Sequence, residues 1–235
     1  MKKFRHELKF YINQFEYEIL RKKVGAVLSL DAHSNDNSGY LIRSLYFDNM
    51  HDNDLYEKNY GILRRKKYRI RVYNCSDQVI KLERKNRVGE YIMKESASLS
   101  REEYEKIMSW DYSFLNQRDE KVMKDFYFLL RNEHLSPRLI VDYMREAYVG
   151  KESDVRITFD KGLSTCSGNV EPNYLFNPHL ATVEALSFPT LIMEVKYNEY
   201  LPTIIRHLLQ LDRHHRSAIS KYVICREKKM QLQNF

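Results

Sequence analysis

The sequence is poor in the residues that build several common kinds of functional site. It has only seven glycines and contains neither a Walker A nor a GxGxxG sequence, so a backbone loop that cradles nucleotide phosphates is not indicated. No GxSxG sequence occurs, which leaves a serine hydrolase without support. Three cysteines, Cys75, Cys166 and Cys225, lie far apart without a CxxC pair, so neither a disulfide framework nor a thiolate zinc site is indicated. Any bound nucleotide must therefore be held by side chains.

Long apolar runs are also absent. No stretch of about 18 apolar residues occurs, and the first residues lack the apolar core of a signal peptide, so we expect a soluble chain in a reducing cytoplasm. The acidic stretch from Asp48 to Asp54 lacks the glycine and the terminal glutamate of an EF-hand loop. Histidines 207, 214 and 215 lack a zinc spacing. We interpret the acidic residues as turn and helix caps and the histidines as surface residues.

The composition is that of a folded protein with a positive charge. Hydrophobic residues make up 43% of the 235 residues and aromatic residues 13%, which is too apolar for a disordered chain despite 30% charged residues. We expect a single domain over residues 1–235. The formal net charge of +7 favours an anionic partner, without saying which one.

Charge on every second residue is the most informative pattern. It occurs in four segments, Arg5-Glu7-Lys9, Lys67-Arg69-Arg71, Lys81-Glu83-Lys85 and Glu194-Lys196. A period of two is typical of a strand with one apolar and one ionic face, on which residues two apart lie roughly 6 to 7 Å from each other. Like charges at that spacing repel unless water screens them or a polyanion occupies the face. A solvated face is the ordinary explanation, but repetition on separate strands favours phosphate binding, for which Arg is well suited.

The remaining periodicity predicts an α+β chain. Strands are expected near 4–12, 40–48, 66–74, 78–86, 90–97, 138–148, 154–160 and 191–196, and helices near 14–28, 52–59, 100–110, 119–133 and from 202. Residues 161–189 read as loop, and 217–225 as either a strand or an extended segment leading into a helix. Short connections favour an antiparallel β-barrel tunnel of about eight strands with surrounding helices. Its ionic faces would then point inward.

Three carboxylates, Glu7, Glu83 and Glu194, are set among these cations. Local ion pairing is the ordinary explanation for such residues. The alternative is oxygen ligation of Mg²⁺ or Mn²⁺, hard cations that bind through a few carboxylates and substrate phosphates. Basic walls with one or two acidic ligands meet the needs of metal-assisted phosphoryl transfer, which depends on positioning and charge neutralisation.

Six short motifs, taken in order over nearly the whole chain, resemble a VTC domain of the bacterial type. They are Arg5-His6-Glu7-Leu8-Lys9-Phe10, Ile42-Arg43-Ser44-Leu45-Tyr46-Phe47-Asp48, Tyr68-Arg69-Ile70-Arg71, Leu82-Glu83-Arg84-Lys85, Met193-Glu194-Val195-Lys196 and Ser220-Lys221-Tyr222. This family is the polyphosphate polymerase branch of the triphosphate tunnel metalloenzymes. The resemblance implies a tunnel barrel that transfers the γ-phosphoryl of ATP to a growing polyphosphate chain with Mn²⁺ or Mg²⁺.

The resemblance also implies roles for individual residues. Phosphates and nucleotide would be bound by Lys9, Arg69, Arg71, Lys85, Lys94, Arg145, Arg156, Lys196, Ser220 and Lys221. Of these, Lys196, Lys221, Arg69 and Arg71 would act in catalysis, and Tyr143 is a further match. The metal would be held by Glu194, with Glu7 as a second ligand.

Two positions depart from the family pattern. Hydrolytic tunnel enzymes begin with Glu-x-Glu-x-Lys, whereas the first position here is Arg5, and the missing acidic ligand favours the polymerase branch. Fungal polymerases carry a basic residue where this chain has Ala218. A triphosphate hydrolase and a non-catalytic polyphosphate-binding module are the alternatives.

Partners follow from the same reasoning. Nucleic acid is not expected, because most aromatic residues of the cationic strands lie opposite the basic face and could not stack on bases. Fungal relatives work beside membrane subunits, so the resemblance makes a membrane-protein partner a candidate for this cytoplasmic chain.

Overall fold

The computed structural model describes residues 6–34, 38–89, 91–211, 214 and 216–233. Arg5 lies outside the described residues, so the interpretation of that position stays a prediction. The sheet runs in the order β1 (His6–Asn13), β10 (Thr190–Tyr197), β8 (Arg156–Thr165), β7 (Ser136–Val149), β3 (Tyr40–Asp48), β4 (Arg64–Tyr73), β5 (Ser76–Val88) and β6 (Tyr91–Leu99). The short strands β2 (Ser29–Leu30) and β9 (Val183–Glu184) pair with β7 and β8.

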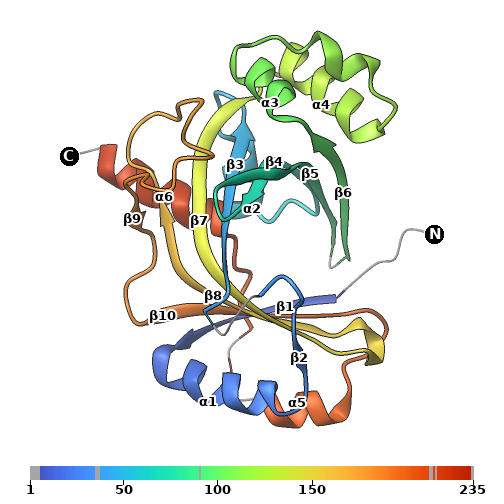
Figure 1. Cartoon of the computed structure of the whole chain (residues 1–235), viewed down its shortest axis with the longest axis vertical. Coiled ribbons are helices and arrows are strands. Elements are labelled where there is room, and N and C mark those ends of the chain that lie inside the picture. Colours follow the sequence, from blue (N-terminus) through green and yellow to red (C-terminus); the bar gives the residue numbers. More distant parts are fainter. Residues whose placement is uncertain (1–5, 35–37, 90, 212–213, 215, 234–235) are drawn as a thin grey trace.

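The expected α+β architecture with an antiparallel sheet is confirmed, with one difference in its closure. Every described strand pair on this path is antiparallel, and the sheet curls strongly into a half-barrel (Figure 1). Within the described residues, no ladder of backbone hydrogen bonds joins the outer strands β1 and β6. Instead, an ion pair of 2.8 Å links Lys85 on β5 to Glu7 on β1. Charged side chains thus bridge the two edges of the sheet, whereas a closed barrel would join its edge strands by backbone hydrogen bonds.

Two groups of helices pack on the apolar outer face of the sheet, and two further helices lie on its inner side. The first group, α1 (Gln14–Gly25) and α5 (Thr203–Leu209), shares an apolar cluster with β1, β8 and β10. The second, α3 (Arg101–Met108), the 3₁₀ helix η1 (Ser113–Gln117) and α4 (Lys121–Asn132), packs with β3 to β6 (Figure 1). The 3₁₀ helix η2 (Glu152–Asp154) joins β7 to β8, and α2 (Asn53–Asn59) lies beside α6 (Lys221–Gln233). None of the described helices is long and apolar enough to cross a bilayer.

Local sequence explains most of these boundaries. A capping box of Ser100 and Glu103 starts α3, since each side chain accepts the other residue's backbone N–H. Asn74 and Cys75 have φ values of 50° and 54°, the left-handed conformation that a two-residue hairpin turn requires. Residues 217–220 are irregular and α6 begins at Lys221, so the extended segment leading into a helix is the correct alternative.

A buried carboxylate fastens α1 to the outer face of the sheet. Glu146 on β7 is fully buried and accepts hydrogen bonds from the Tyr17 hydroxyl at 2.6 Å and the Tyr148 hydroxyl at 2.5 Å. Arg21 Nε donates to the same carboxylate at 3.1 Å. Burial opposes ionisation, but these hydroxyl donors and the positive charges of Arg21 and Lys161 prevail and lower the pKa of Glu146.

We expect Glu146→Gln to destabilise the protein by about 1 to 3 kcal/mol at pH 7, because the cation and the hydroxyls lose their charged acceptor. A carboxylate with a lowered pKa stabilises the fold above its unfolded pKa, and this contribution is lost as the pH falls through the folded pKa. Urea unfolding should therefore show a gap between wild type and variant that closes below about pH 4. Glu171→Gln, at an exposed position, is the control. A gap of constant size at every pH would contradict the role of the charge.

Candidate functional site

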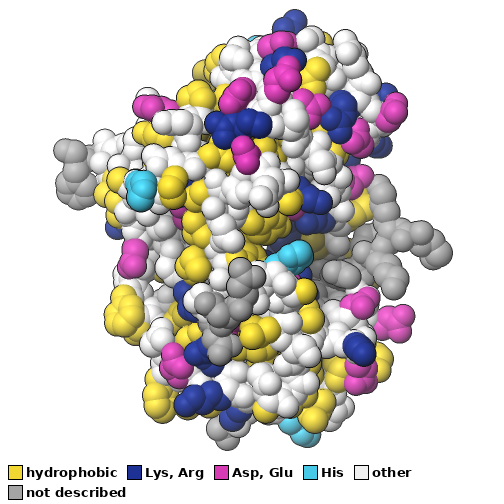
Figure 2. Space-filling model, in the orientation of Figure 1, with side chains coloured by type: hydrophobic (Ala, Val, Ile, Leu, Met, Phe, Trp, Pro, Cys, Tyr) yellow, Lys and Arg dark blue, Asp and Glu magenta, His cyan; other side chains and the backbone are white. Residues whose placement is uncertain are grey.

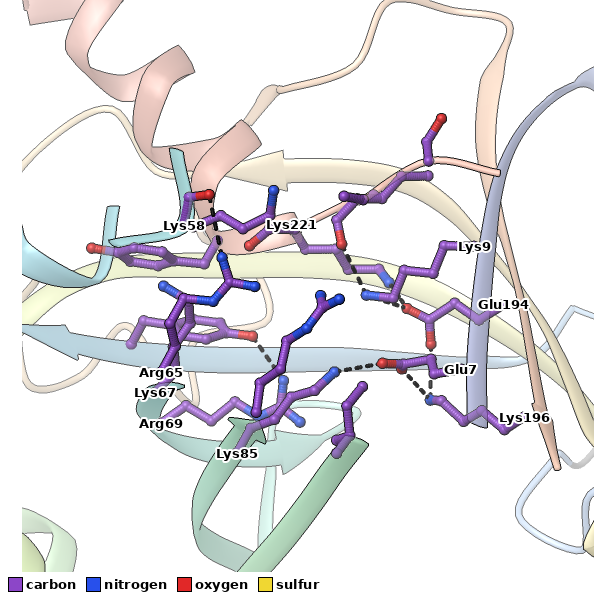
Figure 3. Close-up of a pocket in the computed structure, with 18 of the residues that line it drawn as sticks. Glu7, Lys9, Lys58, Arg65, Lys67, Arg69, Lys85, Glu194, Lys196 and Lys221 are labelled. Atoms are coloured by element: carbon purple, nitrogen blue, oxygen red, sulfur yellow. Dashed lines mark hydrogen bonds and ion pairs between the residues drawn. The ribbon is translucent and has the colours of Figure 1, made fainter. Parts of the chain in front are cut away.

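The ionic faces of the strands enclose one cavity of about 480 Å³ (Figure 3). Its lining contains twelve basic side chains, Lys9, Lys58, Arg65, Lys67, Arg69, Arg71, Lys85, Arg87, Arg145, Lys196, Arg216 and Lys221. Among the residues that the structure describes, the only carboxylates that line it with them are Glu7 and Glu194. This excess of ten positive charges is larger than the +7 of the whole chain, so the rest of the molecule is net negative. On the face shown in Figure 2, basic and acidic side chains are accordingly intermixed, and a recess opens between the upper and lower parts.

Strand register explains how these charges come together. On β4, Arg65, Lys67, Arg69 and Arg71 point inward, while Tyr68, Ile70 and Val72 are buried in the apolar cluster on the other face. Across the β4–β5 ladder, Lys67 lies opposite Lys85 and Arg69 opposite Glu83. Because cross-strand neighbours share a face, two charged strands build one continuous ionic wall.

Glu194 on β10 is the centre of the charge network. It is buried, and its carboxylate lies 2.6 Å from Lys221, 2.9 Å from Lys196, 3.3 Å from Arg145 and 3.4 Å from Lys9. Burial raises the pKa of this group, but the surrounding cations, with Lys196 and Lys221 the strongest, outweigh it and hold the pKa well below its usual range. Glu194 is therefore ionised at neutral pH.

A second carboxylate shares one of these cations. Glu7 lies 2.8 Å from Lys85 and 3.3 Å from Lys196, so the Lys196 ammonium stands between Glu7 and Glu194 (Figure 3). Both carboxylates thus face a single position, which the Lys196 ammonium occupies. Among the described residues, no three His, Cys, Asp or Glu side chains gather into a ready metal cage. The donor set fits a divalent ion that takes two carboxylates and completes its shell with phosphate oxygens and water, as Mg²⁺ commonly does.

Two further carboxylates, which are not among the lining residues, contact several of the lining cations. Asp160 on β8 accepts two hydrogen bonds from Arg145, at 2.6 and 2.7 Å, and lies 2.6 Å from Lys221. Glu83 lies 2.7 Å from both Arg69 and Lys94 and is almost completely buried. Despite burial, these cations keep the pKa of both carboxyls low. Glu83 thus follows the ion-pairing explanation, with its oxygens taken by three cations, Arg71 at 3.8 Å being the third.

Most of the residues singled out in the sequence lie together. The cavity lining includes Glu7, Lys9, Arg69, Arg71, Lys85, Tyr143, Arg145, Glu194, Lys196, Ser220 and Lys221, and also Ala218. Lys94 and Arg156 are not among the lining residues: Lys94 contacts Glu83, and Arg156 contacts Asp31 at 2.5 Å and the Tyr40 hydroxyl at 3.0 Å. The placement is observed, and the chemical role of each residue stays a prediction.

Four of the lining cations were not expected from the sequence, namely Lys58, Arg65, Arg87 and Arg216. For two of them a signal existed, because Arg65 and Arg87 continue the period of two that runs through Lys67 and Lys85. Lys58 comes from α2, whose position over the cavity depends on tertiary packing and leaves no trace in local sequence.

The comparisons with known proteins agree with this geometry. The family model described as VTC domain matches residues 4–229, so the chain belongs to the VTC domain family. A Bacillus halodurans protein named a "putative adenylate cyclase" has a similar fold, with a TM-score of 0.52, 11% identity and coverage of 93% of this chain and 95% of that one. A Vibrio parahaemolyticus protein of the same name has a TM-score of 0.51, 11% identity and coverage of 95% of this chain and 98% of that one. Among curated proteins, no match to this sequence was found.

One group beside the cavity has an unusual ionisation. Asp54 on α2 lies 3.8 Å from Lys67, and its backbone N–H donates to Asp48 at 3.1 Å. Burial, together with the nearby carboxylates of Asp48 and Glu57, raises the pKa of Asp54 to about 8, although Lys67 works in the opposite direction. Because the folded pKa lies above the unfolded one, folding favours the protonated form.

This predicts a pH dependence that one substitution removes. The contribution of Asp54 to the free energy of unfolding is fully present below its unfolded pKa of about 4. It is lost as the pH rises through about 8, and the loss is at most about 1.4 kcal/mol per pH unit. In denaturant titrations, we expect the free energy of unfolding of Asp54→Asn to vary less with pH than that of wild type between pH 4 and 8. Above pH 8 the variant should be the more stable protein. Asp77→Asn, at an exposed position, should follow wild type. A wild-type curve that rises relative to Asp54→Asn across this range would disprove the prediction.

Proposed function

We propose that this chain is an ATP-dependent polyphosphate polymerase that transfers the γ-phosphoryl of ATP to a linear phosphate chain inside the cavity. The observation that carries the proposal is the enclosed lining, in which twelve cations face two carboxylates. A polyanion is the ligand that such a lining fits, because it offsets repulsion among many neighbouring cations at once. Membership of the VTC domain family supports the same conclusion.

The proposed reaction needs charge stabilisation rather than a protein nucleophile. A terminal oxygen of the polyphosphate attacks the γ-phosphorus, the bond from that phosphorus to the β–γ bridging oxygen breaks, and ADP leaves. Lys196 and Lys221, which both contact Glu194, would bind the transferred group and offset the charge on its oxygens. Arg69 and Arg71, held by Glu83, would bind neighbouring phosphates through paired N–H donors.

Mn²⁺ or Mg²⁺ would be held by Glu194 and Glu7, in the place where the Lys196 ammonium now bridges the two carboxylates. Bound there, the metal would neutralise charge on the phosphoryl oxygens. Lys196 would then be released from both carboxylates and become available to a phosphate oxygen.

The direct test is incubation of purified protein with ATP and Mn²⁺. We expect ADP and phosphate chains longer than triphosphate, detected by gel electrophoresis and ³¹P NMR. Release of free phosphate as the sole product would select a triphosphate hydrolase instead. Binding of polyphosphate without any ATP turnover would select a binding module, and either result would remove the polymerase proposal.

Glu194→Gln separates the roles of the central carboxylate. We expect turnover to fall by about 10² to 10³-fold, the usual effect of losing one electrostatic stabiliser. Metal-free tripolyphosphate should bind more tightly than to wild type, because Lys196 and Lys221 no longer have to leave a charged partner. Calorimetry measures the affinity, and Glu171→Gln, at an exposed position that does not line the cavity, is the control. Weaker tripolyphosphate binding in Glu194→Gln would mean that the carboxylate mainly orders the cations.

A further inference from the structure

One buried hydroxyl beside the cavity lacks a hydrogen-bond partner. Thr158 on β8 has an exposed fraction of 0%, and its hydroxyl forms no hydrogen bond within the part of the chain that the structure describes. Burial of a hydroxyl without a partner is costly, so native proteins rarely leave one in this state. The position of Thr158 therefore calls for an explanation.

Strand register places this hydroxyl beside the central carboxylate. Ile157 and Phe159 pack in the outer apolar cluster with α1 and α5, so Thr158 between them points to the inner face of the sheet. Across the β8–β10 ladder, Thr158 lies directly opposite Glu194. The Cβ atoms of such opposite residues are about 4.5 to 5.5 Å apart, a separation at which a hydroxyl can reach a carboxylate by rotation about χ1.

Glu194 has no room for a further donor in this state. Lys221 and Lys9 contact one of its carboxylate oxygens, at 2.6 and 3.4 Å. Lys196 and Arg145 contact the other, at 2.9 and 3.3 Å. A carboxylate offers about four lone-pair sites, and four cations face it here. The hydroxyl opposite therefore gains an acceptor only when one of these cations leaves.

We propose that Thr158 is a positioning residue, which donates a hydrogen bond to Glu194 when a bound phosphate has drawn lysines away from that carboxylate. This inference rests on the proposed function, because it requires a phosphate ligand beside Glu194. As Lys196 and Lys221 turn to the phosphate, the buried carboxylate loses donors, which is unfavourable. The Thr158 hydroxyl replaces one of them without any movement of the backbone.

The same hydrogen bond would serve a bound metal. Carboxylates that ligate a metal ion are ordinarily held in orientation by hydrogen-bond donors outside the ligand set. Thr158 comes from the strand next to that of Glu194, so its hydroxyl can hold the carboxylate without lining the cavity itself.

Thr158→Val tests the proposal, because it removes the hydroxyl and keeps the branched shape of the side chain. Without ligand no hydrogen bond is lost, so the midpoint of urea unfolding should equal or exceed that of wild type. Metal-free tripolyphosphate should bind about tenfold more weakly in calorimetry, because the complex alone loses a hydrogen bond to a charged group. Thr158→Ser keeps the hydroxyl and should bind as wild type does.

A matched control comes from the same strand. Thr165 is equally buried, but its hydroxyl donates to the Ile140 carbonyl at 2.7 Å, and it does not line the cavity. Thr165→Val should therefore lower the midpoint of urea unfolding and leave the tripolyphosphate affinity close to wild type. A general disturbance of β8 would not give these opposite effects in the two variants.

A double-mutant cycle with Glu194→Gln identifies the acceptor. The loss of affinity caused by Thr158→Val should be smaller in Glu194→Gln than in wild type, because hydrogen bonds to a neutral amide are weaker than those to a carboxylate. Without ligand, the same cycle in urea unfolding should show no coupling. An equal loss of affinity in both backgrounds would mean that the hydroxyl has another acceptor, which would overturn the proposal.

The possible failures can be told apart. Wild-type affinity in Thr158→Val, an affinity that Thr158→Ser does not restore, or unfolding of Thr158→Val at a lower urea concentration would each overturn the role of Thr158. The polymerase proposal would then remain in place. Wild-type protein that binds tripolyphosphate without extending it would overturn only the polymerase proposal, and wild-type protein that does not bind it would overturn both.

Discussion

Buried ion pairs to a small number of carboxylates make the interior of this protein compatible with folding. Without Glu194, Asp160 and Glu83, the carboxylate partners of Lys9, Arg69, Arg71, Arg145 and Lys221 would be lost. Each of these carboxylates contacts at least two cations and is almost completely excluded from water. Charge burial on this scale is tolerated only with good pairing geometry, and the distances observed meet that condition. The remaining positive excess is the surplus that a ligand can neutralise.

An ionic interior requires the apolar core to lie elsewhere. The sheet packs its apolar face outward, against α1 and α5 at one end and against α3 and α4 at the other. Tyr222 at the start of α6 reaches the inner side, where its ring lies 5.2 Å from that of Tyr46 and its hydroxyl donates to Asp48 at 2.6 Å. Tyr222 and Tyr46 belong to a third apolar cluster, in which α6 packs on the inner side of β3 and β7. The charged side chains therefore line only the part of the inner wall that this cluster leaves open.

Local periodicity was sufficient to predict the eight main strands and their ionic faces, because a period of two fixes which side chains share a face. The loop expected over 161–189 was partly wrong, since β8 continues to Thr165 and β9 pairs with it. The periodicity placed Arg69 and Lys85 on inward faces. It did not show how far the cavity extends, so Arg65 and Arg87 were overlooked although they belong to the same alternation. Asp160 could not be recognised, because its role depends on Arg145 of the neighbouring strand. Whether the barrel closes could also not be predicted from the sequence, because closure depends on whether two strand edges that are distant in the sequence meet.

Pairing of cations with carboxylates also bears on how a growing chain could move. A phosphate that binds beside Glu194 must replace existing contacts of Lys196 and Lys221, so only the difference between old and new contacts contributes to affinity. A wall of unpaired cations would instead bind the polymer tightly at every rung and hold the product in place. Binding that is equally strong before and in the transition state does not accelerate a reaction. In the proposed reaction, carboxylates behind the cations would therefore keep ground-state binding moderate while leaving positive charge available where the transferred phosphoryl group becomes most negative.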